Sequence, residues 1–405
     1  WWILIMNMLA YGVFFDALQA AYAFQGSLQQ EFGLSATSLS FLTTGLMLTY
    51  ALCAGLGAHL TNKFGARKAI LIGLGIEVAS SLLIPVFGGS YAGLLVLRVI
   101  QGVTGGILAT PVVTSTAMWF PIRQRGLATG ILMGVIGIGL SYVTFFAPRL
   151  LAAGLDWQWA MALVLVVPGA AIGLLYAFSV REIGKVYPGQ LAIAELLQED
   201  LPASMSAPDE IAKRPATLRE AQRTFRFWAL VLYGFNLAWL LYAFSVFLPP
   251  LLGADLGLDA AHATTILSLT FFVGFIGSPL GGVISDLVFK GQRYQVLMIG
   301  FSVTAVCLAL VPFAPVSVLT VLLLLAYAGI TFCIGPYWTI PSVFVQTGAV
   351  ADLVGRLTLL VCIANFLVGP ILALTIDLTG SAFLALYICV ALAAVAVLMA
   401  RAVRT

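Results

Sequence analysis

Charged residues are scarce in this chain of 405 residues, because Lys, Arg, Asp and Glu make up only 9% of it. A soluble domain carries about 25%. Hydrophobic residues reach 61%, so the few polar side chains are too few to cover a body surrounded by water. The formal net charge is +3, with no separate basic domain. The composition excludes a soluble enzyme, a disordered chain and a nucleic-acid-binding protein.

Cysteine and histidine are also rare, and neither forms a recognisable cluster. The five cysteines lie in apolar stretches, no two of them form a CxxC pair, and there are only two histidines. This distribution argues against disulfides, a metal site and redox chemistry. No glycine-rich phosphate-binding loop is present either. We therefore expect no cofactor and no catalytic residue, and we expect a gradient rather than ATP to drive any transport.

Twelve apolar stretches are each long enough to cross a membrane, which takes about 20 residues. They cover residues 3–26, 39–60, 69–87, 91–113, 126–148, 157–178, 226–250, 263–285, 294–313, 317–340, 354–376 and 381–402. The one long polar stretch, 179–225, separates the sixth from the seventh. The sequence predicts an all-α integral membrane protein. Six helices (1–178) precede a linker (179–225) and six further helices (226–405).

The distribution of Lys and Arg predicts the orientation in the membrane. An even number of spans puts both chain ends and the linker on one side. Of the 19 basic residues, all but two fall on that side; Arg149 lies opposite and Arg98 lies within a helix. We predict cytoplasmic termini and a cytoplasmic linker in the plasma (inner) membrane. One chain contains a complete pathway, so we expect a monomer whose partners are lipid, protons and a small-molecule substrate.

Short basic loops recur at matching places in the two predicted halves. Residues 62–68 and 286–293 join the second to the third and the eighth to the ninth helix, and Arg125 and Arg356 precede the fifth and eleventh. With Arg98-Val-Ile-Gln101-Gly102 on the fourth helix, these loops resemble the major facilitator superfamily. The resemblance implies two pseudo-symmetric six-helix halves that move by alternating access. It also implies gating roles for Asn62, Arg67, Arg125, Asp286, Arg293 and Arg356. The family's loop aspartate is Asn62 here, so an ion-paired latch is expected only in the second half.

A narrower resemblance covers residues 217–286. Thr217-Leu-Arg-Glu220 is a capping box before the seventh helix, and Ser278-Pro-Leu-Gly-Gly282 ends the eighth. Both resemble the monocarboxylate and oxalate–formate branch. Members of that branch grip a substrate carboxylate with an Arg where this chain has Ser278, so that grip is absent. The glycine row from Gly130 to Gly139 resembles the antiporter motif of drug exporters, although glycines also let helices pack closely.

Three charged residues lie at membrane depth: Asp16, Glu77 and Arg98. Each costs about 2.5–3.5 kcal/mol on insertion scales. At 1.5 Å per residue, their distances from the predicted helix ends place them within about 5 Å of one level. We predict that they form a proton-coupling centre, as an Asp16–Arg98 pair or a triad with Glu77. The alternative is a static brace inside the first half.

The second half has no charge at this depth but has polar and aromatic side chains within its helices. We predict that these side chains, together with Arg98, bind the substrate: Asn236, Trp239, Tyr242, Tyr327, Thr331 and Asn365. Asn236 and Trp239 are three residues apart, so they share a helix face. The alternative is ordinary packing between helices.

Three functions fit these observations. The first is a proton-coupled carrier of a small organic metabolite, with a monocarboxylate-type organic acid favoured. The second is a drug/proton antiporter that exports lipophilic cations, for which Asp16 and an aromatic wall are suited. The third is a sensor or scaffold that kept the fold without transport. The substrate, the direction and the stoichiometry stay open.

Overall fold

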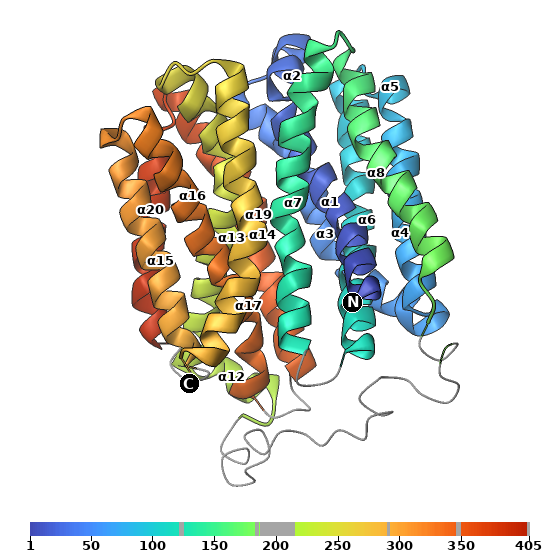
Figure 1. Cartoon of the computed structure of the whole chain (residues 1–405), viewed down its shortest axis with the longest axis vertical. Coiled ribbons are helices and arrows are strands. Elements are labelled where there is room, and N and C mark those ends of the chain that lie inside the picture. Colours follow the sequence, from blue (N-terminus) through green and yellow to red (C-terminus); the bar gives the residue numbers. More distant parts are fainter. Residues whose placement is uncertain (121–124, 183–185, 187–214, 290–291, 346–349, 403–405) are drawn as a thin grey trace.

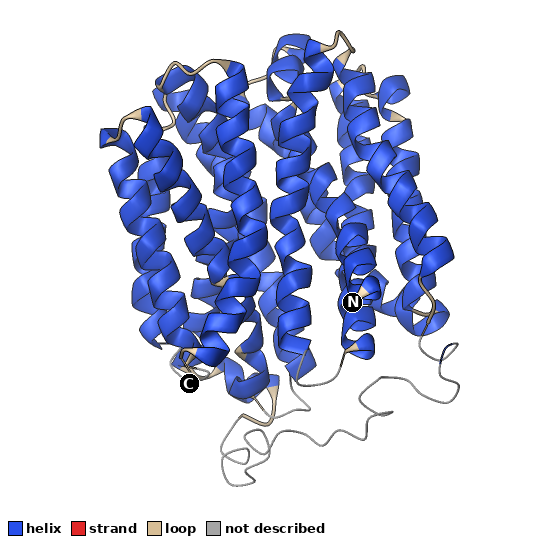
Figure 2. Ribbon diagram, in the orientation of Figure 1, coloured by secondary structure: helices blue, strands red, loops and turns tan. Residues whose placement is uncertain are grey.

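A computed structural model describes residues 1–120, 125–182, 186, 215–289, 292–345 and 350–402. In this part of the chain, twelve helices are long and apolar enough to cross a membrane, which confirms the predicted fold class. Every described element is helical (Figure 2). Most of the predicted linker lies outside the described residues, as do Lys185, Lys213 and Arg214 within it.

The N-terminal half contains the first six spans. Its helices are α1 (Trp2–Ala23), α2 (Gln25–Phe32), α3 (Ala36–Phe64), α4 (Ala66–Leu82), α5 (Ile84–Phe87), α6 (Tyr91–Trp119), α7 (Arg125–Ala152) and α8 (Trp157–Ser179). The first span ends at Ala23 instead of residue 26, and α2 follows it. The fifth span continues four residues past the predicted end, to Ala152.

The C-terminal half contains the other six spans. Its elements are α12 (Leu218–Gln222), α13 (Phe225–Pro250), the π-helical η3 (Leu251–Asp255), α14 (Ala260–Leu287), α15 (Arg293–Leu310), the 3₁₀ turn η4 (Val311–Phe313), α16 (Val316–Phe332), α17 (Ile334–Thr339), α18 (Pro341–Phe344), α19 (Val350–Thr379) and α20 (Phe383–Ala402). The capping box forms at α12, where the Thr217 side chain accepts from the Glu220 backbone N–H at 3.3 Å.

The tenth span and the residues directly after it form three helical pieces, as the prolines there allow. Pro336 has no N–H to donate to the carbonyl of Phe332, so the helix is interrupted at Cys333. Pro341 begins the last piece. The Phe332 carbonyl lies so close to Gly281 of α14 that a side chain there would overlap it.

Two long seams join the halves. α3 packs along α19, and α7 packs along α14. The helices α7 and α14 lie side by side in Figure 1. The α7 seam depends on glycine: a Cβ on Gly137 would lie 2.4 Å from the Phe271 carbonyl oxygen, and one on Gly134 would lie 2.9 Å from that of Phe275. Ser278 is fully buried in this seam and donates to the Gly130 carbonyl at 3.3 Å. Close packing therefore accounts for Gly134 and Gly137 of the glycine row.

Two glycine substitutions on α7 test this seam. Gly137→Ala would force the two helices apart, and overpacking of this kind costs about 1–3 kcal/mol. Gly130→Ala is the matched control, because its Cβ would lie at an ordinary 3.8 Å from Pro279. Thermal unfolding in detergent should show a clearly lower Tm for Gly137→Ala and little change for Gly130→Ala. Equal Tm values for the two variants would contradict the seam.

Candidate functional site

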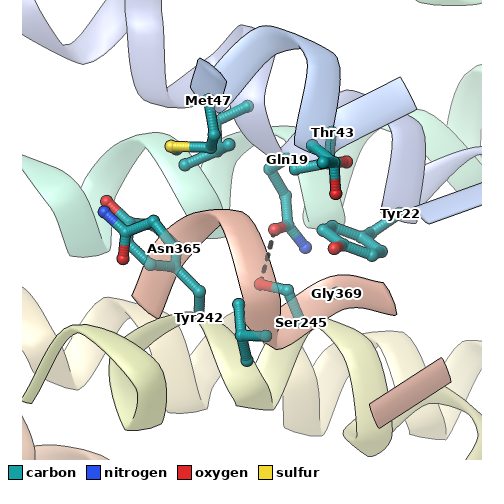
Figure 3. A pocket seen from close by; sticks show the side chains of 11 residues that line it. Gln19, Tyr22, Thr43, Met47, Tyr242, Ser245, Asn365 and Gly369 are labelled. Atoms are coloured by element: carbon teal, nitrogen blue, oxygen red, sulfur yellow. Dashed lines mark hydrogen bonds between the residues drawn. The ribbon is translucent and has the colours of Figure 1, made fainter. Parts of the chain in front are cut away.

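A small pocket lies between the two halves. Helices α1 and α3 supply one wall, and α13 and α19 supply the other (Figure 3). The lining residues are Leu18, Gln19, Tyr22, Thr43, Thr44, Met47, Tyr242, Ser245, Asn365, Val368 and Gly369. The free space holds about one water molecule. No charged side chain is among the lining residues, so the pocket offers neutral hydrogen-bonding groups.

Gln19 connects the halves across this pocket. Its Nε2 donates to Thr144 Oγ1 of α7 at 3.1 Å, and its Oε1 accepts from Ser245 Oγ of α13 at 2.8 Å. The second bond is the dashed line in Figure 3. Gln19 is 1% exposed. Its amide is therefore bonded to a residue of each half of the protein.

Several buried polar atoms around the pocket have no hydrogen-bond partner among the described residues. Thr43 Oγ1 and Asn365 Oδ1 belong to lining residues, one from each half. Asn236 Oδ1, Trp239 Nε1 and Tyr327 Oη lie in the C-terminal half. A buried polar atom left unpaired costs about 1–3 kcal/mol, which is recovered when a water or a ligand supplies the missing bond.

The predicted substrate-binding residues divide into two groups. Tyr242 and Asn365 line the pocket. Arg98, Asn236, Trp239, Tyr327 and Thr331 do not: Asn236 donates to Leu232 of its own helix, and Thr331 bonds back to the carbonyls of Tyr327 and Ala328.

The ring contacts in this region are intrahelical or within the C-terminal half. Trp239 stacks on Phe235, and Tyr327 packs against Phe244 and Phe271. Spacing along one helix groups residues on a face. It does not reveal which neighbouring helix covers that face.

Arg98 is fully buried and is held by neutral partners. Its guanidinium donates to Gln101 Oε1 at 2.7 Å and to the Ala17 carbonyl at 2.6 Å, while its Nε has no partner. Among the described residues, no carboxylate oxygen lies within 4.0 Å of it. Gln101 continues to Ser81, which donates to Glu77 Oε1 at 3.3 Å. Arg98 and Glu77 thus belong to one network without a direct ion pair.

Asp16 lies apart from that network. Its side chain is 5% exposed and makes no hydrogen bond with a described residue. One carboxylate oxygen faces α7, where a Cβ on Gly139 would lie 3.1 Å from it. The Asp16–Arg98 pair that depth counting suggests is therefore not formed. Counting along a helix gives height but not the direction in which a side chain points.

The ends of the halves that lie away from the chain termini meet at a helix cap (Figure 1). Asp377, near the end of α19, accepts from the backbone N–H groups of Ala36 and Thr37 at 3.1 and 2.9 Å, and from the Thr37 hydroxyl at 2.6 Å. These groups form the first turn of α3, where the helix dipole favours an anion. A carboxylate of the C-terminal half therefore caps α3 of the N-terminal half.

Comparison with known proteins gives the family. A profile of the Major Facilitator Superfamily matches residues 1–373. The chain belongs to the major facilitator superfamily. Two transporter structures have the same fold. They are the xylose transporter XylE from E. coli (TM-score 0.72, 15% identity, 98% of this chain and 97% of that one) and a bacterial homologue of the human lysosomal transporter Spinster (TM-score 0.69, 17% identity, 99% and 94%).

Three relatives from this superfamily are each about one quarter identical to this chain. The probable sulfoacetate transporter SauU of Cupriavidus necator is 25% identical over 78% of this chain and 73% of its own length. The hexuronate transporter of Bacillus subtilis is 25% identical over 65% and 59%. The probable nitrate/nitrite antiporter NarK1 of Thermus thermophilus is 26% identical over 98% and 90%. The protein is a multi-pass membrane transporter of small molecules.

Of the six residues predicted to have gating roles, the structure describes three side chains. Arg67 donates to the Ala177 carbonyl at 2.5 Å, inside its own half. Arg293 is partly buried and Arg356 is exposed. The side chains of Asn62, Arg125 and Asp286 lie outside the described residues, so the predicted latch in the second half stays a prediction.

Sequence reasoning missed most of the pocket's polar lining. Gln19, Thr43, Thr44 and Ser245 are polar residues inside apolar stretches, and Gln19 follows Asp16 by three residues. That spacing puts both on one side of α1. The only sequence signal for these lining residues is that they are polar and uncharged. Such residues are too common in membrane helices to indicate a binding site unless their neighbours on other helices are known.

Removal of the Asp377 cap gives a second prediction. Asp377→Ala takes three bonds from the first turn of α3, and loss of a cap this exposed costs about 0.5–1 kcal/mol. The matched control is Asp156→Ala, because Asp156 precedes α8 but makes no side-chain cap bond. Thermal unfolding should give a lower Tm only for Asp377→Ala. Labelling of a cysteine at Ser40 from the membrane side on which this cap lies should also become faster in that variant. If the Tm and the labelling rate are both unchanged, the Asp377 cap does not hold these ends of the two halves together.

Proposed function

We propose that this protein is a proton-coupled secondary transporter of a small organic anion, with a monocarboxylate-type organic acid as the favoured substrate. The observation that carries the proposal is a neutral, hydrogen-bonding pocket shared by both halves, with a buried carboxyl one helical turn away at Asp16. Polar atoms left unpaired at Thr43 and Asn365 are available to a ligand from opposite walls. Alternating access would expose this pocket first to one side and then to the other.

Charge supports an anionic substrate. The lining supplies amide and hydroxyl donors and no carboxylate. Arg98 is a buried cation whose direct hydrogen-bond partners are neutral, and Glu77 is reached from it only through Gln101 and Ser81, so no direct ion pair has to be broken for Arg98 to attract an anion. In a medium with little water, such a charge acts over a longer distance than at a surface. The names of the relatives agree in kind, because sulfoacetate, hexuronate, galactonate and nitrate are all anions.

Proton coupling follows from the isolation of Asp16. A carboxylate buried without partners is costly, and binding a proton removes the charge. When the halves move, contact with water or with Arg98 would favour the ionised form again. Proton binding and release would then accompany the conformational cycle. Glu77 is the second candidate carboxyl, because Oε2 of its side chain has no partner.

The proposed setting is the plasma membrane, with the termini, the linker and the basic loops in the cytoplasm. The asymmetry of Lys and Arg is the reason, since cytoplasmic loops carry an excess of both. A single chain forms the whole pocket, which supports a monomer. Export of lipophilic cations is the competing function, for which Asp16 and the aromatic rings of Tyr22 and Tyr242 are the relevant features.

A thermal-shift screen separates the two functions. We expect sulfoacetate, glucuronate, galactonate or nitrate to raise the Tm of purified protein, since a ligand at 100 times its Kd adds about 2.7 kcal/mol to the native state. Arg98→Gln should abolish that rise, whereas Arg98→Lys, which keeps the charge, should retain part of it. Stabilisation by tetraphenylphosphonium alone would contradict an anion carrier and favour the exporter.

Transport in liposomes tests the coupling. Asp16→Asn should abolish uptake driven by an imposed pH gradient but preserve exchange of labelled for unlabelled substrate, because exchange needs no net proton movement. Glu77→Gln is the matched variant, a second buried carboxyl made neutral at constant size. Gradient-driven uptake that survives Asp16→Asn and fails in Glu77→Gln would move the coupling role to Glu77. Loss in neither variant would contradict coupling through a buried carboxyl.

A further inference from the structure

The hydrogen bonds around Gln19 have a fixed direction. Thr144 Oγ1 lies 2.7 Å from the Leu140 carbonyl oxygen, which can only accept, so the single hydroxyl proton of Thr144 is used there. Towards Gln19, Thr144 can then only accept a bond. The Gln19 amide must therefore turn its nitrogen to Thr144 and its oxygen to Ser245. The order of donation runs from Ser245 to Gln19, from Gln19 to Thr144, and from Thr144 to Leu140.

One donor in this chain of bonds is left over. A glutamine amide carries two N–H groups, and Thr144 uses one. The second makes no bond with any described residue, and Gln19 lines the pocket. Ser245 has already donated its proton, so its hydroxyl offers only acceptor capacity to the pocket. Gln19 thus presents an N–H of set orientation at the interface between the halves.

We propose that Gln19 contacts the anionic group of the substrate through this second N–H, and that Thr144 is the positioning residue that keeps the amide turned as a donor. The inference rests on the proposed function, because it names the residue that donates a hydrogen bond to the anionic group of the substrate. An amide free to turn over would accept from an ammonium group as readily as it donates to a carboxylate. Thr144 removes that choice, so the direction of the bonds becomes a determinant of specificity.

The same amide joins substrate binding to closure of the pocket. Gln19 and Thr144 belong to the N-terminal half, whereas Ser245 belongs to α13 of the C-terminal half. A substrate oxygen that accepts from the N–H polarises the amide and makes its carbonyl oxygen a better acceptor. The bond from Ser245 then strengthens. An anion in the pocket therefore favours the arrangement in which the halves are in contact there.

Binding measurements on variants of the full chain test this assignment. The probes are sulfoacetate, glucuronate, galactonate and nitrate, with ethanolamine as a small cation that carries donors. Gln19→Met, which has similar volume and no donor, should weaken anion binding at least tenfold. Gln19→Glu, which has only acceptors when it is ionised, should weaken it further at a pH where the carboxyl is ionised. Anion binding unchanged in Gln19→Met would overturn the inference and leave the proposed function standing.

The positioning role has its own readout, the ratio of anion to ethanolamine affinity. Thr144→Val frees the amide to turn over, so this ratio should fall even if Tm changes little. Thr270→Val is the matched control: Thr270 is also buried and also donates to its own helix, at Ile266, but lies away from the pocket. A fall in Tm at a constant ratio would show that Thr144 is only structural and would overturn its part of the inference.

A measurement without ligand checks the chain of bonds itself. If Gln19 and Thr144 are bonded, the loss of Tm in the double variant Gln19→Met, Thr144→Val should be smaller than the sum of the two single losses. Additive losses would overturn the inference whatever the probes do. If no anion stabilises the wild type and ethanolamine does, the proposed substrate class fails and the inference fails with it.

Discussion

A bilayer offers no water to a polar atom, so each buried donor and acceptor of this chain has to find its partner inside the protein. The backbone meets this demand by forming helices, and where Pro336 frees the carbonyl of Phe332, Gly281 of α14 lies directly against that carbonyl. Polar side chains meet it less completely. Buried polar side chains that lack a hydrogen-bond partner inside the protein are therefore informative about function.

Two buried amides illustrate the difference. Asn7 uses both of its N–H groups, on Ser115 and Thr116, and its oxygen accepts from Tyr176 at 2.8 Å. Nothing is left over, and the cluster binds α1, α6 and α8 to each other. Gln19, twelve residues further along α1, keeps one N–H free and points into a pocket. The first amide has the bonding expected of a brace, and the second has the bonding expected of a site that awaits a ligand.

Most of the fold could be predicted from local features of the sequence. Apolar length predicted twelve spans, and the prolines of the tenth span and the capping box at Thr217 behaved as their chemistry requires. The site was predicted less well, because its members come from four helices that are distant in sequence. Tyr242 and Asn365 were identified from polarity alone. Gln19, Thr43 and Ser245 become meaningful only when α1, α3 and α13 are placed side by side.

The separation of Asp16 from Arg98 shows why depth was not enough. Both residues lie at a similar height, but Arg98 turns to the backbone of Ala17 behind α1, while Asp16 turns to Gly139 on α7. A bonded pair would have been electrically neutral and costly to break, by about 3–5 kcal/mol for loss of one partner. Two separate charges have no such bond to break. Asp16 makes no hydrogen bond with a described residue, so it can exchange a proton without first giving up a partner, and Arg98 forms no direct ion pair that an anion in the pocket would have to displace. Coupling between proton and substrate then needs no rearranged salt bridge, only a change in what surrounds α1 when the halves move.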